Sequence, residues 1–168
     1  REGKVLPGNI IKVDGFLNHR VDPQLLTEIA DEFSKHFDTK NITMVLTAEA
    51  SGIPLATICA DTFGVPVVFA KKSKTSNIPD SVYSCPVKSY THGNVNTVMV
   101  SKQYLNADDR VLIVDDFLAN GCALNGLVDL AQAAGATVVG AGIVIEKAYQ
   151  GGGDALRQRG VRVESLAR

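Results

Sequence analysis

Two adjacent carboxylates stand where a buried segment of the sequence meets a short turn that contains glycine. Asp115 and Asp116 directly follow the apolar residues 111–114, and the turn 119–121 comes after them. Beyond Cys122, apolar residues recur at helical spacing. A short apolar run is typical of a strand covered on both faces, and the later spacing predicts a helix. The two acids therefore lie between a predicted strand and the amino end of a predicted helix.

This arrangement suits a ligand that carries both a phosphate group and hydroxyl groups. Helix amino ends bind anions, whereas carboxylates accept hydrogen bonds from sugar hydroxyls or ligate hydrated Mg²⁺. An apolar strand ending in two acids also occurs in P-loop nucleotidases and in response regulators. The sequence contains no G-x-x-x-x-G-K-[ST], which excludes the first class. The long segment before Asp115 argues against the second class, whose acidic pair lies near the start of its domain.

A second strand, turn and helix precede this motif and carry polar residues in the turn. Residues 43–47 (TMVLT) predict a buried strand, and a helix is predicted over 54–63. The turn between them contains Glu49, Ser51 and Gly52. An acid, a hydroxyl and a glycine before a helix are weak evidence alone, but they suit a second anion-binding loop one unit earlier in the chain.

Three lysines follow the next predicted strand, over 65–70. They are Lys71, Lys72 and Lys74. A basic cluster of this kind is most often a solvated turn. At the carboxyl ends of a parallel sheet, beside two predicted phosphate loops, these side chains would help to neutralise a pyrophosphate.

Strands alternate with helices along the chain, which predicts an α/β domain with a mostly parallel central sheet flanked by helices. Asp22 and Pro23 mark the start of an earlier helix, because aspartate caps helices and proline favours their first position. After the central motif, the sequence predicts a strand over 137–145, a short helix over 154–159 and a last strand from 161. Every polar candidate follows a strand, and ligands bind at that edge of open sheets.

Two segments depart from this alternation. Residues 1–21 predict an irregular hood with a short strand at 10–13. Residues 73–104 are rich in polar residues, and the runs 82–90 and 95–101 flank a polar turn. This pattern predicts a hairpin, and a polar insertion over a site commonly acts as a flexible lid.

Composition indicates an ordinary globular protein. The 168 residues are 45% hydrophobic and 21% charged, which suits one domain, 1–168, with a sizeable core. A net charge of −1 gives no reason to expect nucleic acid or a membrane as partner, and no apolar run approaches a membrane span. Cys59, Cys85 and Cys122 form neither a disulfide framework nor a zinc pattern, so a reducing cytoplasm is expected.

The acidic motif resembles the site for phosphoribosyl pyrophosphate (PRPP) in type I phosphoribosyltransferases. Matches to the purine enzymes of that family that use xanthine cover nearly the whole chain, including 12–23 (KVDGFLNHRVDP), 49–53 (EASGI), 115–121 (DDFLANG) and 142–147 (GIVIEK). The resemblance implies the type I fold with its hood and lid, PRPP-bound Mg²⁺ and a homodimer. It also implies transfer of the phosphoribosyl group to xanthine.

The resemblance also implies roles for individual residues. Asp115 and Asp116 would be catalytic, lying along the ribose hydroxyls, and either could ligate Mg²⁺ held by PRPP. The remaining PRPP contacts would be Ala119, Asn120, Gly121, Cys122 and Ala123 around the 5′-phosphate, with Glu49, Ser51 and Gly52 at the pyrophosphate. Cys122 departs from the hydroxyl or amide side chain common in this loop, so its backbone N–H is the expected contact.

The purine contacts implied by the resemblance are Ile11, Asn18 and Lys147. An ammonium only donates hydrogen bonds, so Lys147 favours a 6-oxopurine over adenine. The alternative is a surface lysine that pairs with Glu146. A hypoxanthine–guanine enzyme would also need this lysine. A regulator that senses PRPP without turnover is a further alternative, although the sequence shows neither a basic arm nor a helix-turn-helix.

Overall fold

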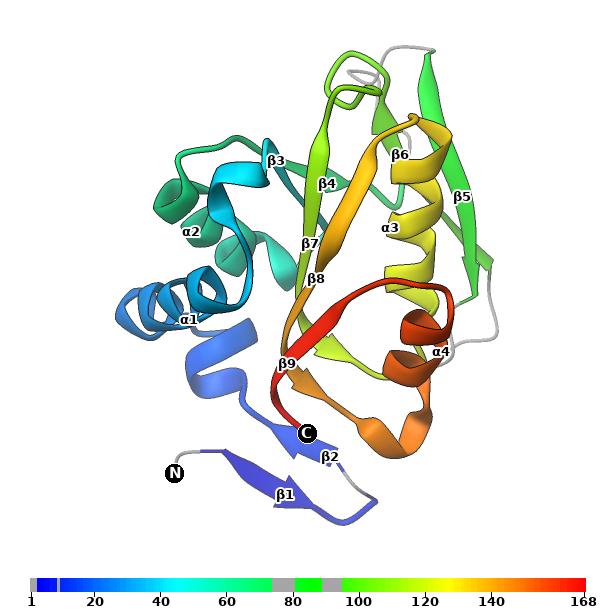
Figure 1. The fold of residues 1–168 in the computed structure, drawn as a ribbon. Helices are drawn as coiled ribbons and strands as arrows, with labels where there is room; N and C mark the ends of the chain where they lie inside the picture. The colour runs from blue at the N-terminus through cyan, green and yellow to red at the C-terminus, as the bar shows by residue number, and fades with distance from the viewer. Residues whose placement is uncertain (1–2, 9, 74–80, 89–94) are drawn as a thin grey trace.

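The computed structural model describes residues 3–8, 10–73, 81–88 and 95–168. Five strands form one parallel sheet in the order β4-β3-β7-β8-β9 (Figure 1). Their bounds are β3 Met44–Ala48, β4 Val67–Ala70, β7 Arg110–Leu118, β8 Thr137–Glu146 and β9 Val163–Ala167. The predicted α/β sheet is thus present, with its acid-bearing strand at the centre.

Helices cover both faces of this sheet, α1 and α2 on one side and α3 and α4 on the other (Figure 1). Their bounds are α1 Pro23–His36, α2 Gly52–Phe63, α3 Cys122–Ala133 and α4 Gly152–Gln158, with short 3₁₀ turns at Thr39–Asn41 and Ala148–Gln150. No helix in the described part of the chain is long and apolar enough to span a bilayer.

Local sequence signals explain where the first helix begins and which side it buries. The Asp22 carboxylate accepts the N–H of Gln24 at 3.0 Å, and proline occupies the first helical position, as expected. One apolar stripe, including Leu26 and Phe33, is buried against the sheet. Burial of that stripe stabilises the helix more than helix propensity does.

The central strand continues beyond the apolar run that predicted it. The sequence places the strand end at Val114, but β7 extends to Leu118. Asp115 pairs with Ile143 and Leu118 pairs with Glu146 in the parallel ladder with β8. The ladder uses backbone groups, so acidic side chains are tolerated within the strand where they find hydrogen-bond donors. The prediction that both acids follow the strand was therefore wrong.

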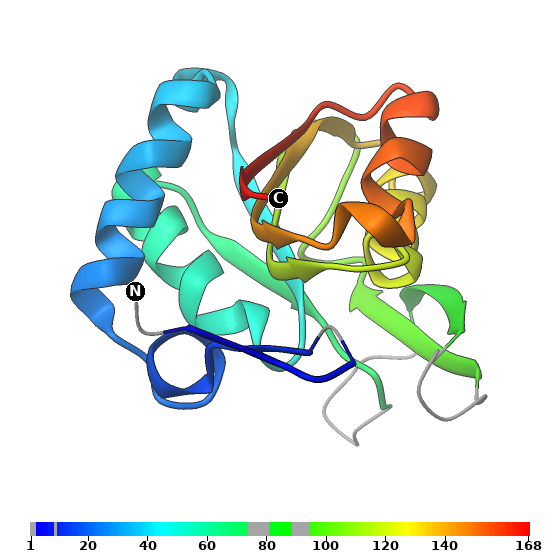
Figure 2. The same ribbon diagram turned by 90° about the horizontal axis from the view of Figure 1, so that it is seen from below.

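The hood is more ordered than the sequence predicted. Strands β1 (Lys4–Leu6) and β2 (Ile10–Lys12) form an antiparallel hairpin, and a π-helix over Asp14–Asn18 follows. Figures 1 and 2 show this segment across the edge of the sheet where β7 and β8 end. The N-terminal segment is thereby placed over the end of the strand that carries the two acids.

The predicted hairpin of the 73–104 insertion appears as strands β5 (Val82–Lys88) and β6 (Val95–Ser101), which pair antiparallel. It packs on α3, where a Cβ at Gly126 would lie 2.5 Å from the Val87 side chain. The polar turn of the hairpin and Lys74 lie outside the described residues.

Candidate active site

Two predicted site residues from distant parts of the chain meet at a third, Asp116. Its side chain is buried, with 4% of the residue exposed. Asn18 of the hood donates Nδ2–H to Oδ2 at 3.0 Å, and the Ser51 hydroxyl donates to Oδ1 at 3.0 Å. The hood, the turn before α2 and the central strand are therefore joined through one carboxylate.

Asp115 is half-buried and lies next to this network. Its Oδ1 accepts the N–H of Asp116 at 2.9 Å. Burial, followed by the neighbouring carboxylate of Asp116, raises the pKa of Asp115 well above its ordinary value, and the positive charge of Lys72 opposes this rise. The protein therefore leaves the negative charge of this pair only partly compensated.

Oxygen atoms around Asp115 suit a hard cation. Thr47 is fully buried, and its hydroxyl has no hydrogen-bond partner among the described residues. It lies beside Asp115, since a Cβ at Gly52 would overlap the Thr47 hydroxyl and lie 2.9 Å from Asp115 Oδ1. Among the described residues, no group of three or more His, Cys, Asp or Glu side chains is arranged to hold a metal ion. Such a site fits Mg²⁺, which keeps waters and ligand oxygens in its shell rather than filling an all-protein cage.

The turn before α2 is hydrogen-bonded to the end of β4 and the residues that follow it. Glu49 Oε1 accepts the N–H of Lys72 at 2.6 Å, and the N–H of Glu49 donates to the Ala70 carbonyl at 3.0 Å. The peptide bond between Glu49 and Ala50 is cis. These contacts place Lys72 beside the predicted pyrophosphate turn, where its charge also acts on Asp115.

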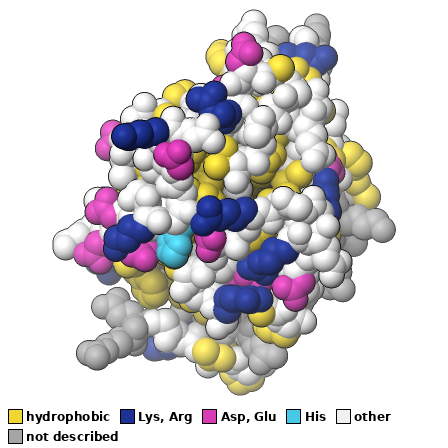
Figure 3. Space-filling view, viewed as in Figure 1, with side chains coloured by type: hydrophobic (Ala, Val, Ile, Leu, Met, Phe, Trp, Pro, Cys, Tyr) yellow, Lys and Arg dark blue, Asp and Glu magenta, His cyan; other side chains and the backbone are white. Residues whose placement is uncertain are grey.

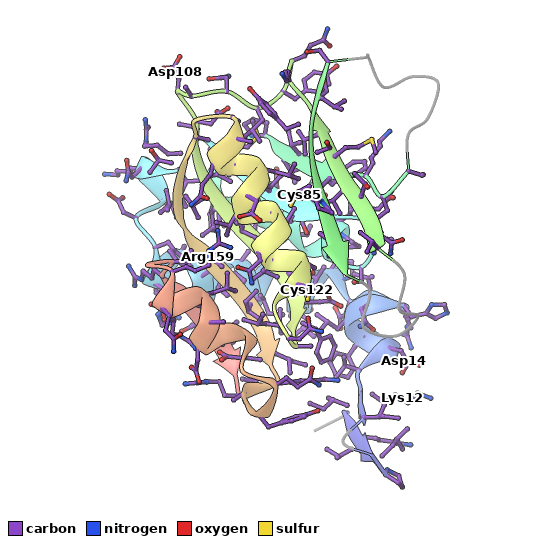
Figure 4. The ribbon with its side chains drawn as sticks, turned by 90° about the vertical axis from the view of Figure 1, so that its right-hand side faces the viewer. Lys12, Asp14, Cys85, Asp108, Cys122 and Arg159 are labelled. Atoms are coloured by element: carbon purple, nitrogen blue, oxygen red, sulfur yellow. The ribbon has the colours of Figure 1, made fainter. Side chains whose placement is uncertain are left out.

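The predicted phosphate loop precedes α3 and packs on the start of α4. Gly152 donates its N–H to the Ala119 carbonyl at 3.2 Å. The N–H of Cys122 donates to Asn120 Oδ1 at 3.0 Å, so a phosphate oxygen would compete with this side chain for the same donor. Figure 4 shows Cys122 at the end of α3 that faces the hood residues Lys12 and Asp14.

The predicted purine residues lie on the hood and at the end of β8. Ile11 is half-buried in β2. Lys147 donates its N–H to the Leu118 carbonyl at 2.8 Å, and its ammonium lies 5.5 Å from the centre of the Phe117 ring. Within the described residues no carboxylate pairs with this ammonium; Glu146 instead pairs with Arg157 and Arg168. The alternative of a Lys147–Glu146 pair is therefore wrong.

A cavity of about 590 Å³ lies elsewhere, along the outer side of β4. Its lining includes Met44, Phe69, Met99 and Tyr104, and Lys71 is its one residue among the predicted candidates. The polar contacts around Asp116, rather than this apolar hollow, mark the candidate site.

Known proteins match both the sequence and the fold. A family model described as "Phosphoribosyl transferase domain" matches residues 20–155. The chain belongs to the phosphoribosyltransferase family. Xanthine phosphoribosyltransferase of Lachnoclostridium phytofermentans is 53% identical over 99% of this chain and 86% of its own. The Bacillus cytotoxicus protein of the same name is 53% identical over 99% of this chain and 84% of its own.

Solved structures of phosphoribosyltransferases have the same fold as this chain. The APRTase of Giardia lamblia, crystallised with 9-deazaadenine, has a TM-score of 0.84 at 26% identity and covers 99% of this chain and 93% of its own. Adenine phosphoribosyltransferase of Saccharomyces cerevisiae has a TM-score of 0.75 at 21% identity over 86% of this chain and 81% of its own. The type I phosphoribosyltransferase fold and the family predicted from the sequence are confirmed.

Sequence reasoning missed two features beside the predicted site. Thr47 was assigned only to a buried strand, although a hydroxyl within an apolar run is a signal that could have singled it out. The contact of Gly152 with the phosphate loop had no such local signal, because it joins α4 to a turn about thirty residues earlier.

Proposed function

We propose that the chain is a purine-salvage enzyme that transfers the 5-phosphoribosyl group of PRPP to xanthine, giving xanthosine 5′-monophosphate (XMP) and pyrophosphate. The observation that carries the proposal is the 53% identity with xanthine phosphoribosyltransferases over 99% of the chain. The arrangement around Asp116 supports it, because residues predicted to contact the purine, the sugar and the pyrophosphate are joined there by hydrogen bonds.

The proposed chemistry rests on positioning and charge. Asp115 and Asp116 hold the ribose hydroxyls, and the amides of 119–123 bind the 5′-phosphate once it displaces the Asn120 side chain. Asp115 and Thr47 would offer oxygens to Mg²⁺ bound with PRPP, and the ion would neutralise charge on the departing pyrophosphate. The purine nitrogen attacks C1′ directly, so no residue serves as a covalent nucleophile.

Residues in the hood and at the end of β8 select the purine base. Lys147 donates to the 6-oxo oxygen of the purine, whereas the amino group of adenine would face this donor without an acceptor. Asn18 lies beside the sugar site through its hydrogen bond to Asp116, and we assign it to the second oxo group of xanthine. The hood and the β5–β6 hairpin exclude water from the reacting centre.

Two further proposals concern the whole protein. Its three free thiols suit a reducing compartment, and we propose a cytoplasmic enzyme. The family resemblance supports a homodimer, which light scattering of the purified protein would test.

The proposed function is tested by measuring steady-state rates with PRPP, Mg²⁺ and each of four bases: xanthine, guanine, hypoxanthine and adenine. We expect kcat/KM to be highest for xanthine and lowest for adenine. A clear preference for hypoxanthine would assign the chain to the hypoxanthine–guanine enzymes. Tight PRPP binding without turnover of any base would indicate a regulator.

A further inference from the structure

A buried ion pair outside the predicted site lies at the end of β8. Glu146 is 2% exposed, and Arg157 donates Nη1 to Oε1 at 3.0 Å and Nη2 to Oε2 at 2.8 Å. The Ser165 hydroxyl donates to Oε2 at 2.6 Å, and Arg168 adds a contact to Oε1 at 3.3 Å. Figure 3 shows acidic and basic side chains interspersed over the face that carries α4 and β9.

A buried, paired carboxylate constrains the positions of the segments that pack on it. Loss of one partner would leave a buried charge without an opposite charge beside it, which is strongly destabilising. A two-point arginine contact adds orientation to that constraint. The first turn of α4 packs directly on this pair: a Cβ at Gly153 would overlap Glu146 Oε1 and lie 2.8 Å from Arg157 Nη1.

The same turn of α4 supports the predicted phosphate loop. Gly152 donates to the Ala119 carbonyl at 3.2 Å, and a Cβ at Gly152 would lie 2.5 Å from the Gly121 nitrogen. The backbones of α4 and of the loop are therefore in direct contact, with no side chain between them that could absorb a displacement.

The predicted base-selecting lysine adjoins the other side of the ion pair. Lys147 is the next residue after Glu146, and its N–H is held by the Leu118 carbonyl at 2.8 Å. Glu146 thus contacts the first turn of α4, which supports the phosphate loop, and directly precedes Lys147, which is assigned to the purine.

We propose that Glu146 is a positioning residue that sets the separation between the purine site at Lys147 and the 5′-phosphate site at 119–121. The inference rests on the proposed function, and it assigns Arg157 as the partner through which Glu146 acts. A nucleotide product touches both sites at once, whereas free xanthine uses only the purine site, and PRPP only the sugar-phosphate site. Binding of XMP therefore measures the separation directly.

The test compares the affinities of XMP, PRPP with Mg²⁺, and xanthine by calorimetry in Glu146→Gln and Arg157→Lys. The first variant keeps the shape of the side chain and removes its charge; the second keeps the charge and removes the two-point contact. We expect XMP affinity to fall about 10-fold or more in both variants, and affinity for PRPP or xanthine to change by about threefold at most.

Asp129→Asn is the matched control, because Asp129 on α3 also pairs with an arginine, Arg159, at 2.7 Å, but its side chain is partly exposed rather than buried. It should leave all three affinities within about twofold of the parent. Equal losses for the three ligands in the Glu146 or Arg157 variant would show a general loss of folded protein and overturn the proposal, as would unchanged XMP binding in both. Failure of the parent protein to bind XMP would instead overturn the proposed function.

Discussion

Acidic side chains on two neighbouring strands, β7 and β8, have opposite environments. Glu146 on β8 meets the guanidinium group of Arg157, which together with Ser165 holds its pKa at about 2 against burial. Asp115 on β7 meets mainly another acid, and burial raises its pKa well above the ordinary value. The strands are adjacent in the ladder, so position in the sheet does not explain the difference.

The difference lies in what the protein supplies to each charge. Two arginines and a serine complete the surroundings of Glu146, so no ligand is needed there. The Asp115–Asp116 pair receives neutral donors and one opposing lysine charge, and it is the pair for which a cation or sugar hydroxyls would improve the energy. A carboxylate left under-compensated inside a fold is a candidate functional group, whereas a fully paired one is a structural or positioning group.

The largest effect should come from removing the under-compensated charges. We expect Asp115→Asn combined with Asp116→Asn to lower kcat/KM by about 1,000-fold or more, because contacts to the sugar and to Mg²⁺ are lost together. Circular dichroism would establish that the variant is folded, and Asp61→Asn on the exposed side of α2 is the control. A rate near that of the parent would refute the assignment of the sugar site.

Removal of the Lys147 ammonium should affect one substrate only. Lys147→Ala is expected to raise the KM for xanthine about 10- to 100-fold and leave that for PRPP nearly unchanged, because a charged hydrogen bond to the base is lost. Lys102→Ala is the control, since the Lys102 ammonium also lies over an aromatic ring, 5.1 Å from the centre of Tyr83. Equal rises for both substrates would contradict the role in base recognition.

Neutral substitutions of Asp115 and Glu146 should change the stability of the protein in opposite directions at neutral pH. The pKa of Asp115 in the folded protein lies above its value of 3.8 in the unfolded chain. Ionisation of Asp115 therefore lowers the free energy of unfolding as the pH rises above about 3.8. Asp115→Asn should therefore raise the midpoint of thermal unfolding at pH 7, and the gain should vanish as the pH falls toward 4. Calorimetry from pH 7 to pH 4 measures this, and a lower midpoint at pH 7 would contradict it.

Glu146 should show the reverse. Its pKa is lowered from 4.5 to about 2, so its contribution to stability is complete above pH 4.5 and is lost as the pH falls toward 2. Glu146→Gln should lower the unfolding midpoint at pH 7, and the deficit should shrink over that acidic window. A deficit that does not depend on pH would mean that the charge itself contributes little.

The smallest effect is expected from one neutral hydrogen bond. Ser51→Ala removes a donor from Asp116 and should raise the KM for PRPP by less than about 10-fold, with little change in the midpoint of unfolding. Ser34→Ala removes a comparable bond, from a hydroxyl to the Asp31 carbonyl on exposed α1, and is the matched control. A loss as large as that of the aspartate variants would place Ser51 among the essential residues.

Much of the fold followed from local sequence signals. The Asp22–Pro23 start of α1, the start of the strand that carries Asp115, and the helix from Cys122 were predicted close to where they are observed. Element boundaries were less accurate at β7, because the sequence suggests that acids end a buried strand, while the backbone ladder continues past them.

Local patterns along the chain are enough to predict the alternation of strands and helices and the motif that identifies the family, because periodicity, caps and turn residues act within a few positions of one another. Which charges are compensated depends on the tertiary structure: Asn18 reaches Asp116 from the hood, and Arg157 reaches Glu146 from α4. Among the described residues, the Thr47 hydroxyl beside Asp115 has no hydrogen-bond partner. Burial and charge pairing arise from contacts between segments far apart in the chain, and no local pattern contains that information.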